Sequence, residues 1–362
     1  MIYLDHNATT RLRPEALDAM AVARTNHRNP MSLHRPGRRA RVSLDQARES
    51  VRQLCGAPKA DVVFTSGGTE ADHLAVRGLA HAQRKSRGAD TVLLSDIEHP
   101  AVTEAAQILK AEGFKILSVP APDGRVSTSA LADLLNEKVA VVEVMLAHNT
   151  TGIVQPVEEI GELAIRSGIP MHVDAVQAAG KIPIDFYKLG ATSLALSAHK
   201  FGGPRGVGAL VLQKCVELSP IWTGGGQEEG KRSGSHAGAL IAGMAAAADA
   251  IELQTVETAQ KRDFLEQGIL KLSKINVLGA EHPRLPNTLS VIIDGIVGRD
   301  FVEAMDAKGI ALSAGAACHS AGGGSTVAGQ VRFSIGNDTT TEQLNEAIAA
   351  ATETVQALRG KV

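Results

Sequence analysis

Short apolar segments alternate with longer amphipathic segments between about residues 60 and 215 of the chain. The short segments are rich in β-branched residues and predict buried strands, whereas the longer ones repeat their apolar positions at helical spacing. Strands separated by helices in this way form a mainly parallel sheet that is covered on both faces. The predicted strands are Val62–Thr65, Thr91–Ser95, Lys115–Val119, Val139–Leu146, Pro170–Asp174, Ser193–Ser197 and Val207–Leu212, and the helices between them include Glu70–Arg84, Ala101–Ala111 and Val157–Ser167.

The pattern changes after a run of three glycines at positions 224–226. An alanine-rich helix is predicted over Ala237–Gln254, and strands and helices then alternate over shorter distances to the end of the chain. The predicted helices are Thr258–Leu272, Asp300–Lys308 and Thr341–Leu358, and the strands are Ser290–Asp294, Ala311–Ala314 and Val331–Ile335. We therefore expect a large α/β domain over residues 14–254 and a small α+β domain over residues 255–362, with residues 1–13 packing near the small domain.

Composition narrows the class of protein. A chain of 362 residues with 44% hydrophobic content can bury a large core, which excludes a disordered or fibrous protein. The net charge is −2, from 37 basic and 39 acidic residues, and only 3% of the residues are aromatic. Neither a strong positive field nor a set of stacking side chains is therefore present for nucleic acid, and we expect no nucleic-acid partner.

We also expect no membrane span and no metal site. The longest apolar runs fall far short of the roughly 18 residues that a membrane helix needs, and the N-terminal residues do not resemble a signal peptide. Cys55, Cys215 and Cys318 are scattered and lack a CxxC spacing, which argues against a disulfide framework or a zinc site. A cytoplasmic protein fits these features, and Cys55 and Cys215 are expected to be inert core thiols.

Candidate chemistry lies where predicted strands end. The segment Ser66–Glu70 follows a strand and opens a helix, so its free N–H groups and two glycines suit an anion. A capping box between Thr69 and Asp72 would explain the same residues without a ligand. Asp174 also ends an apolar strand, where a carboxylate serves either as a helix cap or as the partner of a cation.

Lys200 follows another buried strand and stands 26 residues after Asp174. It could be an ordinary surface lysine, but partial burial would lower its pKa and make its amine able to form a Schiff base. Pyridoxal phosphate requires all three features at once, namely N–H donors for the phosphate, an acid for the pyridine nitrogen and an amine for the aldehyde. The combination therefore points to this cofactor.

The sequence resembles the class V aminotransferase-like cysteine desulfurases and selenocysteine lyases, which are fold type I pyridoxal phosphate enzymes. The resemblance runs nearly from end to end and rests on the number and order of its motifs. These motifs are Tyr3–Thr10, Asn29–Ser32 with Gly37-Arg38, Phe64–Glu70, Glu98-His99, Asn149 with Thr151–Val154, Asp174 with Gln177, Ser197–Lys200, Gly225–Glu228, Arg232–Gly234, Pro286–Thr288, Gly315–Ser320 and Arg332–Gly336.

The resemblance implies a fold type I architecture, with a large domain built on a mainly parallel seven-stranded sheet and a small C-terminal domain. It also implies that Lys200 binds the cofactor covalently and shuttles protons, that His99 stacks on the cofactor ring and is a candidate acid or base, and that Cys318 accepts the substrate's sulfur as a persulfide. The remaining implied cofactor contacts are Gly68, Thr69, Asp174, Gln177, Ser197, His199 and Ser235, and the implied substrate contacts are Asn7, Asn149 and Arg332.

Ser235 matches a family threonine that reaches the phosphate of the neighbouring subunit, so the resemblance implies a homodimer with shared sites. The implied reaction removes sulfur from L-cysteine to give L-alanine. The sulfur acceptor stays open among an iron–sulfur scaffold, a tRNA-thiolation relay and another carrier protein. Taken singly, His99 could be a loop histidine, Arg332 a surface ion-pair residue and Cys318 a small filler.

The sequence departs from the family pattern in four places, three single residues and one segment. Thr150 replaces a glutamate, Ser235 replaces the threonine and Asn337 replaces an arginine. The fourth departure is the short segment His319–Val331, whose thirteen residues separate Cys318 from Arg332. A short tether limits the reach of a thiol that must deliver sulfur.

These departures leave alternatives. Selenocysteine lyase activity is less affected by a short tether, because selenide can leave without attack by cysteine. Another pyridoxal phosphate reaction on the same scaffold, or a relative kept only for binding, is also open. The intact set of Lys200, Asp174 and His99 argues against the last of these.

Overall fold

The computed structural model describes residues 1–25, 28–315 and 329–360, which form two compact units. Unit 1 contains Met1–Thr10, Ala147–Val154 and Leu253–Val362. Unit 2 contains Arg11–Leu146 and Gln155–Glu252. The short segment Ala147–Val154 therefore belongs to unit 1, although it lies in the middle of the sequence that builds unit 2.

Unit 2 is built on a seven-stranded sheet with the order β2-β8-β7-β6-β5-β3-β4. Strands β7, β6, β5, β3 and β4 pair in parallel, and β8 is antiparallel to both β2 and β7. The mainly parallel α/β fold predicted from the sequence is thus confirmed. The strands are β2 (Asp61–Thr65), β3 (Thr91–Ser95), β4 (Lys115–Val119), β5 (Val139–Met145), β6 (Met171–Asp174), β7 (Ser193–Ser197) and β8 (Gly208–Leu212).

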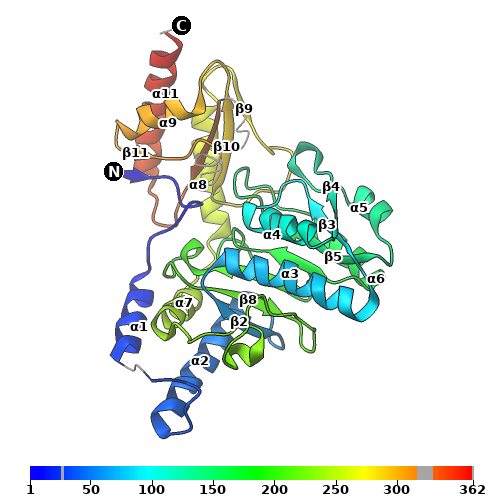
Figure 1. Cartoon of the computed structure of the whole chain (residues 1–362). Helices are drawn as coiled ribbons and strands as arrows, with labels where there is room; N and C mark the ends of the chain where they lie inside the picture. Colours follow the sequence, from blue (N-terminus) through cyan, green and yellow to red (C-terminus); the bar gives the residue numbers. More distant parts are fainter. Residues whose placement is uncertain (26–27, 316–328, 361–362) are drawn as a thin grey trace. The chain divides into compact units, whose positions relative to one another are not determined.

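Helices cover this sheet because its strands carry apolar residues that must be shielded from water. Helices α3 (Gly68–Arg87) and α4 (Pro100–Ala111) pack side by side against β3 and β5 through a buried apolar cluster (Figure 1). Helix α6 (Val157–Arg166) packs against β5 and β6, and the short helix α5 (Thr128–Leu134) contacts α6. Among the described residues, no helix is both long and apolar enough to cross a lipid bilayer.

Three further helices of unit 2 pack together: α1 (Pro14–Thr25), α2 (Arg35–Leu54) and α7 (Gly238–Asp249) (Figure 1). Helix α7 ends at Asp249, before the predicted end at Gln254. The carbonyl of Ala250 accepts a hydrogen bond of 3.1 Å from Nη1 of Arg13, so a side chain takes the place of the next helical turn. A separate helix, α8 (Thr255–Ile269), then begins in unit 1.

Unit 1 contains an antiparallel three-stranded sheet with the order β12-β10-β9. Its strands are β9 (Ile275–Val277), β10 (Thr288–Ile293) and β12 (Gln330–Ser334), and its helices are α8, α9 (Gly298–Asp306) and α11 (Thr341–Arg359). The N-terminal strand β1 (Ile2–Tyr3) pairs in parallel with β11 (Ile310–Ala311). The strand predicted over Ala311–Ala314 is shorter than expected, because Ser313 forms an isolated bridge with Arg332 instead.

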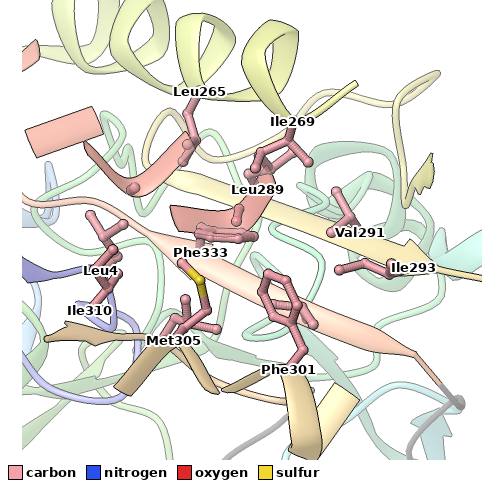
Figure 2. Close-up of a cluster of buried hydrophobic side chains, with 14 of the residues drawn as sticks. Leu4, Leu265, Ile269, Leu289, Val291, Ile293, Phe301, Met305, Ile310 and Phe333 are labelled. Atoms are coloured by element: carbon pink, nitrogen blue, oxygen red, sulfur yellow. The ribbon is translucent and has the colours of Figure 1, made fainter. Parts of the chain in front are cut away.

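The two faces of this small sheet differ in chemistry because successive strand residues point to opposite sides. Leu289, Val291 and Phe333 share one face and pack against α8, α9 and α11, as Figure 2 shows for Leu265, Ile269, Phe301 and Met305. The opposite face is polar, and it is also buried. It carries Thr288, Ser290, Gln330, Arg332 and Ser334. Unit 1 therefore has an apolar core on one side of its sheet and a buried polar cluster on the other.

Candidate functional site

The N-terminus of α3 lies beside two other loops of unit 2. A Cβ atom on Gly68 would lie 2.8 Å from Cγ2 of Val176 and 3.4 Å from Cβ of Ser197, so only glycine lets these segments approach so closely. The next residue, Thr69, is exposed at the helix start. The first-turn N–H groups of α3 therefore stand next to the end of β7 and the loop after β6, as an anion site requires.

A capping box between Thr69 and Asp72 does not form. The N-cap residue of α3 is Gly67, which makes no side-chain capping bond. Oε2 of Glu70 accepts the backbone N–H of Ser66 at 2.7 Å, and Glu70 also pairs with Arg232, whose Nε lies 2.7 Å from Oε1. Burial raises the pKa of Glu70, but the bonds from Arg232 and Ser66 outweigh burial and hold it below its usual value.

Lys200 closes a short helical turn, Ala198–Lys200, that follows β7 directly. The carbonyl of Ala198 accepts the N–H groups of Phe201 at 3.1 Å and Gly203 at 2.9 Å, which fold the chain back on itself. Gly202 adopts a φ of +91°, a conformation that favours glycine. The glycines after Lys200 thus make a tight loop that holds the lysine at the end of the strand.

Asp174 ends β6, the strand that neighbours β7 in the sheet, so it lies at the same sheet edge as Lys200. Its Oδ1 accepts the backbone N–H of Val176 at 2.9 Å. Burial raises the pKa of Asp174, whereas His99, the N–H of Val176 and Lys200 act in the opposite direction. Gln177 follows Asp174 closely along the chain and is also buried. Its Oε1 accepts a hydrogen bond of 2.6 Å from Nζ of Lys181.

His99 is the N-cap of α4, and its Nδ1 accepts the backbone N–H of Ala101 at 3.1 Å. Because Nδ1 is an acceptor, the proton of the neutral ring resides on Nε2. The histidine is close enough to Asp174 to lower the pKa of that carboxyl. The loop histidine considered from the sequence therefore has a defined orientation and one defined transferable proton.

His199 and Ser197 complete the group at the end of β7. Burial, followed by the charges of Lys200, Arg205 and Lys181, lowers the pKa of His199 to about 4. His199 is therefore neutral near pH 7 and can take part in an anion site as a hydrogen-bond partner.

Ser235 is exposed on a loop that a buried glutamate organises. Glu228 accepts two bonds from Arg48, at 2.8 and 3.2 Å, and its Oε1 lies 2.9 Å from Nε2 of His236. Both Glu228 and Glu229 have positive φ angles, of 48° and 55°, so this turn is held in a conformation that side chains rarely adopt.

The predicted substrate contacts come together in unit 1. Arg332 is 1% exposed and donates from Nη1 to the carbonyl of Asn149 at 3.0 Å. The side chain of Asn7 donates to the same carbonyl at 3.3 Å and to Oγ1 of Thr288 at 2.9 Å. Arg332 also donates from Nη2 to Oδ1 of Asp5 at 2.6 Å, an ion pair between a buried guanidinium and a partly buried carboxylate rather than a surface pair.

Two of the three cysteines can be placed, and Cys318 lies outside the described residues. Cys55 is fully buried, and burial raises the pKa of its thiol to about 12. Cys215 is exposed, so the expectation that it is a core thiol was wrong. Its φ of 63° marks a turn after β8, and that turn directs the residue to the surface. Among the described residues, no cluster of His, Cys, Asp and Glu could hold a metal ion.

A buried group of three acids and a histidine lies behind the sheet edge, and the sequence did not predict that these residues come together. Its members are Asp72, Glu98, Glu143 and His172. Oε1 of Glu98 accepts the backbone N–H of Met145 at 2.8 Å and a short bond from Ser95, whereas neither oxygen of Glu143 has a hydrogen-bond partner among the described residues. Glu143 and His172 interrupt otherwise apolar strand segments, and that interruption was the available signal.

Comparison with known proteins shows the family of the chain. The family model for class V aminotransferases matches residues 2–346. The chain belongs to the class V aminotransferase family. It is 44% identical over 325 residues to a cysteine desulfurase of Cereibacter sphaeroides, covering 88% of this chain and 83% of the relative. It is 38% identical over 381 residues to the cysteine desulfurase NifS of Azotobacter vinelandii, covering 99% of this chain and 93% of the relative.

Solved structures show the same fold. A NifS-like protein from Rickettsia africae superposes with a TM-score of 0.88 at 28% identity, over 98% of this chain and 99% of that one. Class V aminotransferases of this kind depend on pyridoxal phosphate. The residues of unit 2 fit the cofactor: Gly68 lets Val176 and Ser197 approach the N-terminus of α3 closely, and Asp174 and Lys200 follow or end neighbouring strands.

Proposed function

We propose that this chain is a cysteine desulfurase that uses pyridoxal phosphate to convert L-cysteine to L-alanine and passes the sulfur to Cys318. The observation that carries the proposal is the placement of Asp174 and Lys200 at the same edge of the sheet, on the neighbouring strands β6 and β7. An acid and an amine in this relation suit the two ends of the cofactor's ring system. Membership of the family and the names of its relatives support the same activity.

The cofactor contacts in this proposal divide by chemical type. Lys200 binds the aldehyde carbon through its amine, Asp174 pairs with the pyridine nitrogen and Gln177 donates to the ring hydroxyl. The phosphate is held by the N-terminal turn of α3, and the contributing residues are Gly68, Thr69, Ser197 and His199. The neutral state of His199 is compatible with this role, because its ring can still donate one hydrogen bond.

Two residues of unit 2, Lys200 and His99, transfer protons in this proposal. When bound, the pyridine ring draws off the electrons that are released at the substrate Cα. The amine of Lys200 removes the proton from Cα and returns a proton to the product. His99 supplies the proton on Nε2, because its Nδ1 is already engaged by the backbone of Ala101.

Substrate binding and sulfur transfer involve unit 1 in this proposal. Arg332 binds the α-carboxylate of the substrate, with Asn149 and Asn7 beside it. The thiolate of Cys318 attacks the substrate sulfur, the bond between that sulfur and Cβ breaks, and Cβ gains a proton. The products are L-alanine and a persulfide on Cys318, so one thiol and L-cysteine are converted with no external oxidant or reductant.

We also propose that the enzyme is a cytoplasmic homodimer in which Ser235 reaches the phosphate bound by the partner subunit. The exposure of Ser235 supports this role, since the side chain is open to a second molecule. The buried contacts of Glu228 with Arg48 and His236 hold the turn beside it. A carrier protein is the proposed sulfur acceptor.

The test measures L-alanine released from L-cysteine by the purified holoenzyme. Lys200→Ala is expected to remove the cofactor's visible absorbance band and alanine formation together. Lys188→Ala is the matched control, because Lys188 is an exposed lysine of the same unit that pairs with Glu158. Pyruvate or a keto acid as the main product, or no uptake of pyridoxal phosphate, would contradict the proposal.

Cys318→Ala distinguishes the two activities that the sequence leaves open, cysteine desulfurase and selenocysteine lyase. Loss of alanine formation from L-cysteine is the result expected for a desulfurase. The segment of thirteen residues between Cys318 and Arg332 favours a second activity on L-selenocysteine. Retained release of selenide by the same variant would support that activity.

A further inference from the structure

The guanidinium of Arg332 is almost completely excluded from water, so each of its N–H groups needs an acceptor within the protein or on a ligand. Nη1 donates to the carbonyl of Asn149 at 3.0 Å. Nη2 donates to Oδ1 of Asp5 at 2.6 Å and to Oγ of Ser313 at 3.1 Å. All of these residues belong to unit 1.

Nε of Arg332 is different, because this buried atom has no hydrogen-bond partner among the described residues. Leaving a buried charged donor unpaired is costly, and native structures seldom do so without a reason. The unpaired N–H therefore marks the side of the guanidinium on which an acceptor of a ligand can bind.

A carboxylate binds arginine most strongly when it accepts two parallel N–H groups. The Nε–H group is parallel to one N–H of Nη2, and these two groups form the available fork. However, Nη2 has only two hydrogens, and Asp5 and Ser313 already supply two acceptors. A ligand carboxylate can use the fork only if one of these acceptors leaves Nη2.

Asp5 is the acceptor that can leave, and in doing so its Oδ1 also gives up the hydrogen bond of 3.0 Å that Oγ of Ser313 donates to it. Ser313 is held by two backbone hydrogen bonds to Arg332, of 2.8 and 3.2 Å. The side chain of Asp5 is 18% exposed, compared with 2% for Arg332, so its carboxylate has access to water. Charge favours the same choice, because Asp5 and a ligand carboxylate together would place two negative charges on one buried cation.

We propose that Asp5 is an internal substitute for the substrate's carboxylate: it holds Nη2 of Arg332 in the free protein and yields to the α-carboxylate of the amino-acid ligand. This inference rests on the proposed role of Arg332 in binding substrate. In the free protein the contact keeps a buried cation paired, which avoids the cost of an isolated buried charge. In the complex the exchange weakens binding of every carboxylate ligand, so Asp5 sets the affinity of the site.

The test compares two ligands that differ in their carboxyl group, L-alanine and L-alaninamide, by calorimetric titration of the holoenzyme. Asp5→Asn removes the competing charge with almost no change of shape. We expect L-alanine to bind about five- to tenfold more tightly to this variant, and L-alaninamide to bind with less than a twofold change. With L-cysteine, the change is expected in KM rather than in kcat. Unchanged or weaker binding of L-alanine would overturn the proposal.

Ser313→Ala is the companion variant: it removes a neutral acceptor from the same nitrogen and also the hydroxyl that donates to Oδ1 of Asp5 at 3.0 Å. Because this variant loosens Asp5 but leaves its charge in place, we expect a smaller effect on L-alanine than that of Asp5→Asn, and an equally large effect would overturn the argument from charge. Arg332→Lys separates this inference from the proposed function. If it leaves L-alanine affinity unchanged, the carboxylate contact itself is wrong. If it weakens binding while Asp5→Asn has no effect, only the role of Asp5 is wrong.

A measurement on the wild-type protein avoids variants altogether. A crystal structure of the holoenzyme with L-alanine is expected to show the ligand's carboxylate on Nε and Nη2 of Arg332, with Asp5 turned away. An Asp5 carboxylate that keeps its bond to Nη2 in that complex would contradict the proposal.

Discussion

Nε2 of His172 lies 3.2 Å from Oδ1 of Asp72, and both side chains are almost fully buried inside unit 2. His172 comes from β6 and Asp72 from α3. Nδ1 of His172 makes a second contact of 2.8 Å with Oγ of Ser193 on β7. The histidine thus joins a helix and two strands directly behind the sheet edge that carries Asp174.

Burial lowers the pKa of His172 to about 3, from about 6.5 in an unfolded chain. Between these values the unfolded chain binds a proton that the folded protein does not, so the free energy of unfolding falls as the pH decreases. We expect His172→Gln to reduce this loss by up to about 1.4 kcal/mol per pH unit below pH 6. Urea unfolding of both proteins at several pH values checks this, and parallel stability curves would contradict it.

Glu98 affects the free energy of unfolding in the opposite direction as the pH changes. Burial raises its pKa to about 8, against the effect of its bonds from Ser95 and Met145. As the pH rises from about 4.5 to about 8, the unfolded chain loses a proton that the folded protein keeps, so stability decreases. Glu98→Gln keeps the acceptor oxygen and removes the titration. We expect a gain of about 1–3 kcal/mol at pH 7.5 that disappears near pH 4.5.

The matched variant for that experiment is Glu98→Ala, which also removes the acceptor for Ser95 and Met145. It is expected to lower stability at both pH values, because two buried donors lose their partner. Equal stability of wild type and Glu98→Gln at pH 7.5 would show that Glu98 is not protonated in the folded protein.

Glu143 lies in the middle of β5, and neither of its buried oxygens has a hydrogen-bond partner among the described residues. Burial and the neighbouring Glu98 raise the pKa of its carboxyl well above the usual value. Glu143→Leu should therefore stabilise the protein by about 1–3 kcal/mol, seen as a higher midpoint of thermal unfolding. Glu143→Gln keeps a polar side chain and should gain less stability. A midpoint of Glu143→Leu below that of the wild type or of Glu143→Gln would contradict this explanation.

Arg232 compensates a charge at the proposed phosphate site, because it pairs with Glu70 in the first turn of α3. Without Arg232, the carboxylate of Glu70 would repel an anion at this helix end. We expect Arg232→Ala to bind pyridoxal phosphate about tenfold more weakly, measured by absorbance titration of the apoprotein. Lys231→Ala is the control, since Lys231 pairs with Glu229 and Asp61 instead. Adding Glu70→Gln to Arg232→Ala should restore part of the affinity.

The two described cysteines should differ sharply in reactivity, because the thiolate is the reactive form and needs access to the reagent. Cys215 is exposed, whereas Cys55 is fully buried with its pKa raised to about 12. In a Cys318→Ala background, we expect the folded protein to react rapidly with one equivalent of a thiol reagent. Cys215→Ser should abolish this reaction, and rapid labelling of Cys55 would contradict the structure.

Much of the fold of unit 2 could be predicted from the sequence, because hydrophobic periodicity is a local property of the chain. The strands Thr91–Ser95, Lys115–Val119 and Ser193–Ser197 have the predicted bounds. Helix α2 was missed, although it is amphipathic, because its apolar residues are sparse among many arginines. The end of α7 was misplaced for another reason: the Arg13 side chain that takes over the carbonyl of Ala250 comes from a distant part of the chain.

The candidate site, too, could be predicted only in part from the sequence. Lys200, Asp174 and the glycines before α3 stand at strand ends, a position that the sequence pattern shows and that parallel sheets use for ligands. The ion pairs around these residues could not be predicted, because Glu70 contacts Arg232 and Glu228 contacts Arg48 only in the folded chain.

Local patterns along the chain were enough to predict the alternation of strands and helices, the mainly parallel sheet and the residues that stand at its edge. Which charges are buried, and with which residues they pair, became known from the folded units. Asp5 and Arg332 are 327 positions apart, and Asp72 and His172 are 100 apart, yet each pair is in direct contact. Secondary structure follows from spacing between near neighbours, whereas the electrostatics of a buried site depend on distances in space that close only when the whole unit packs.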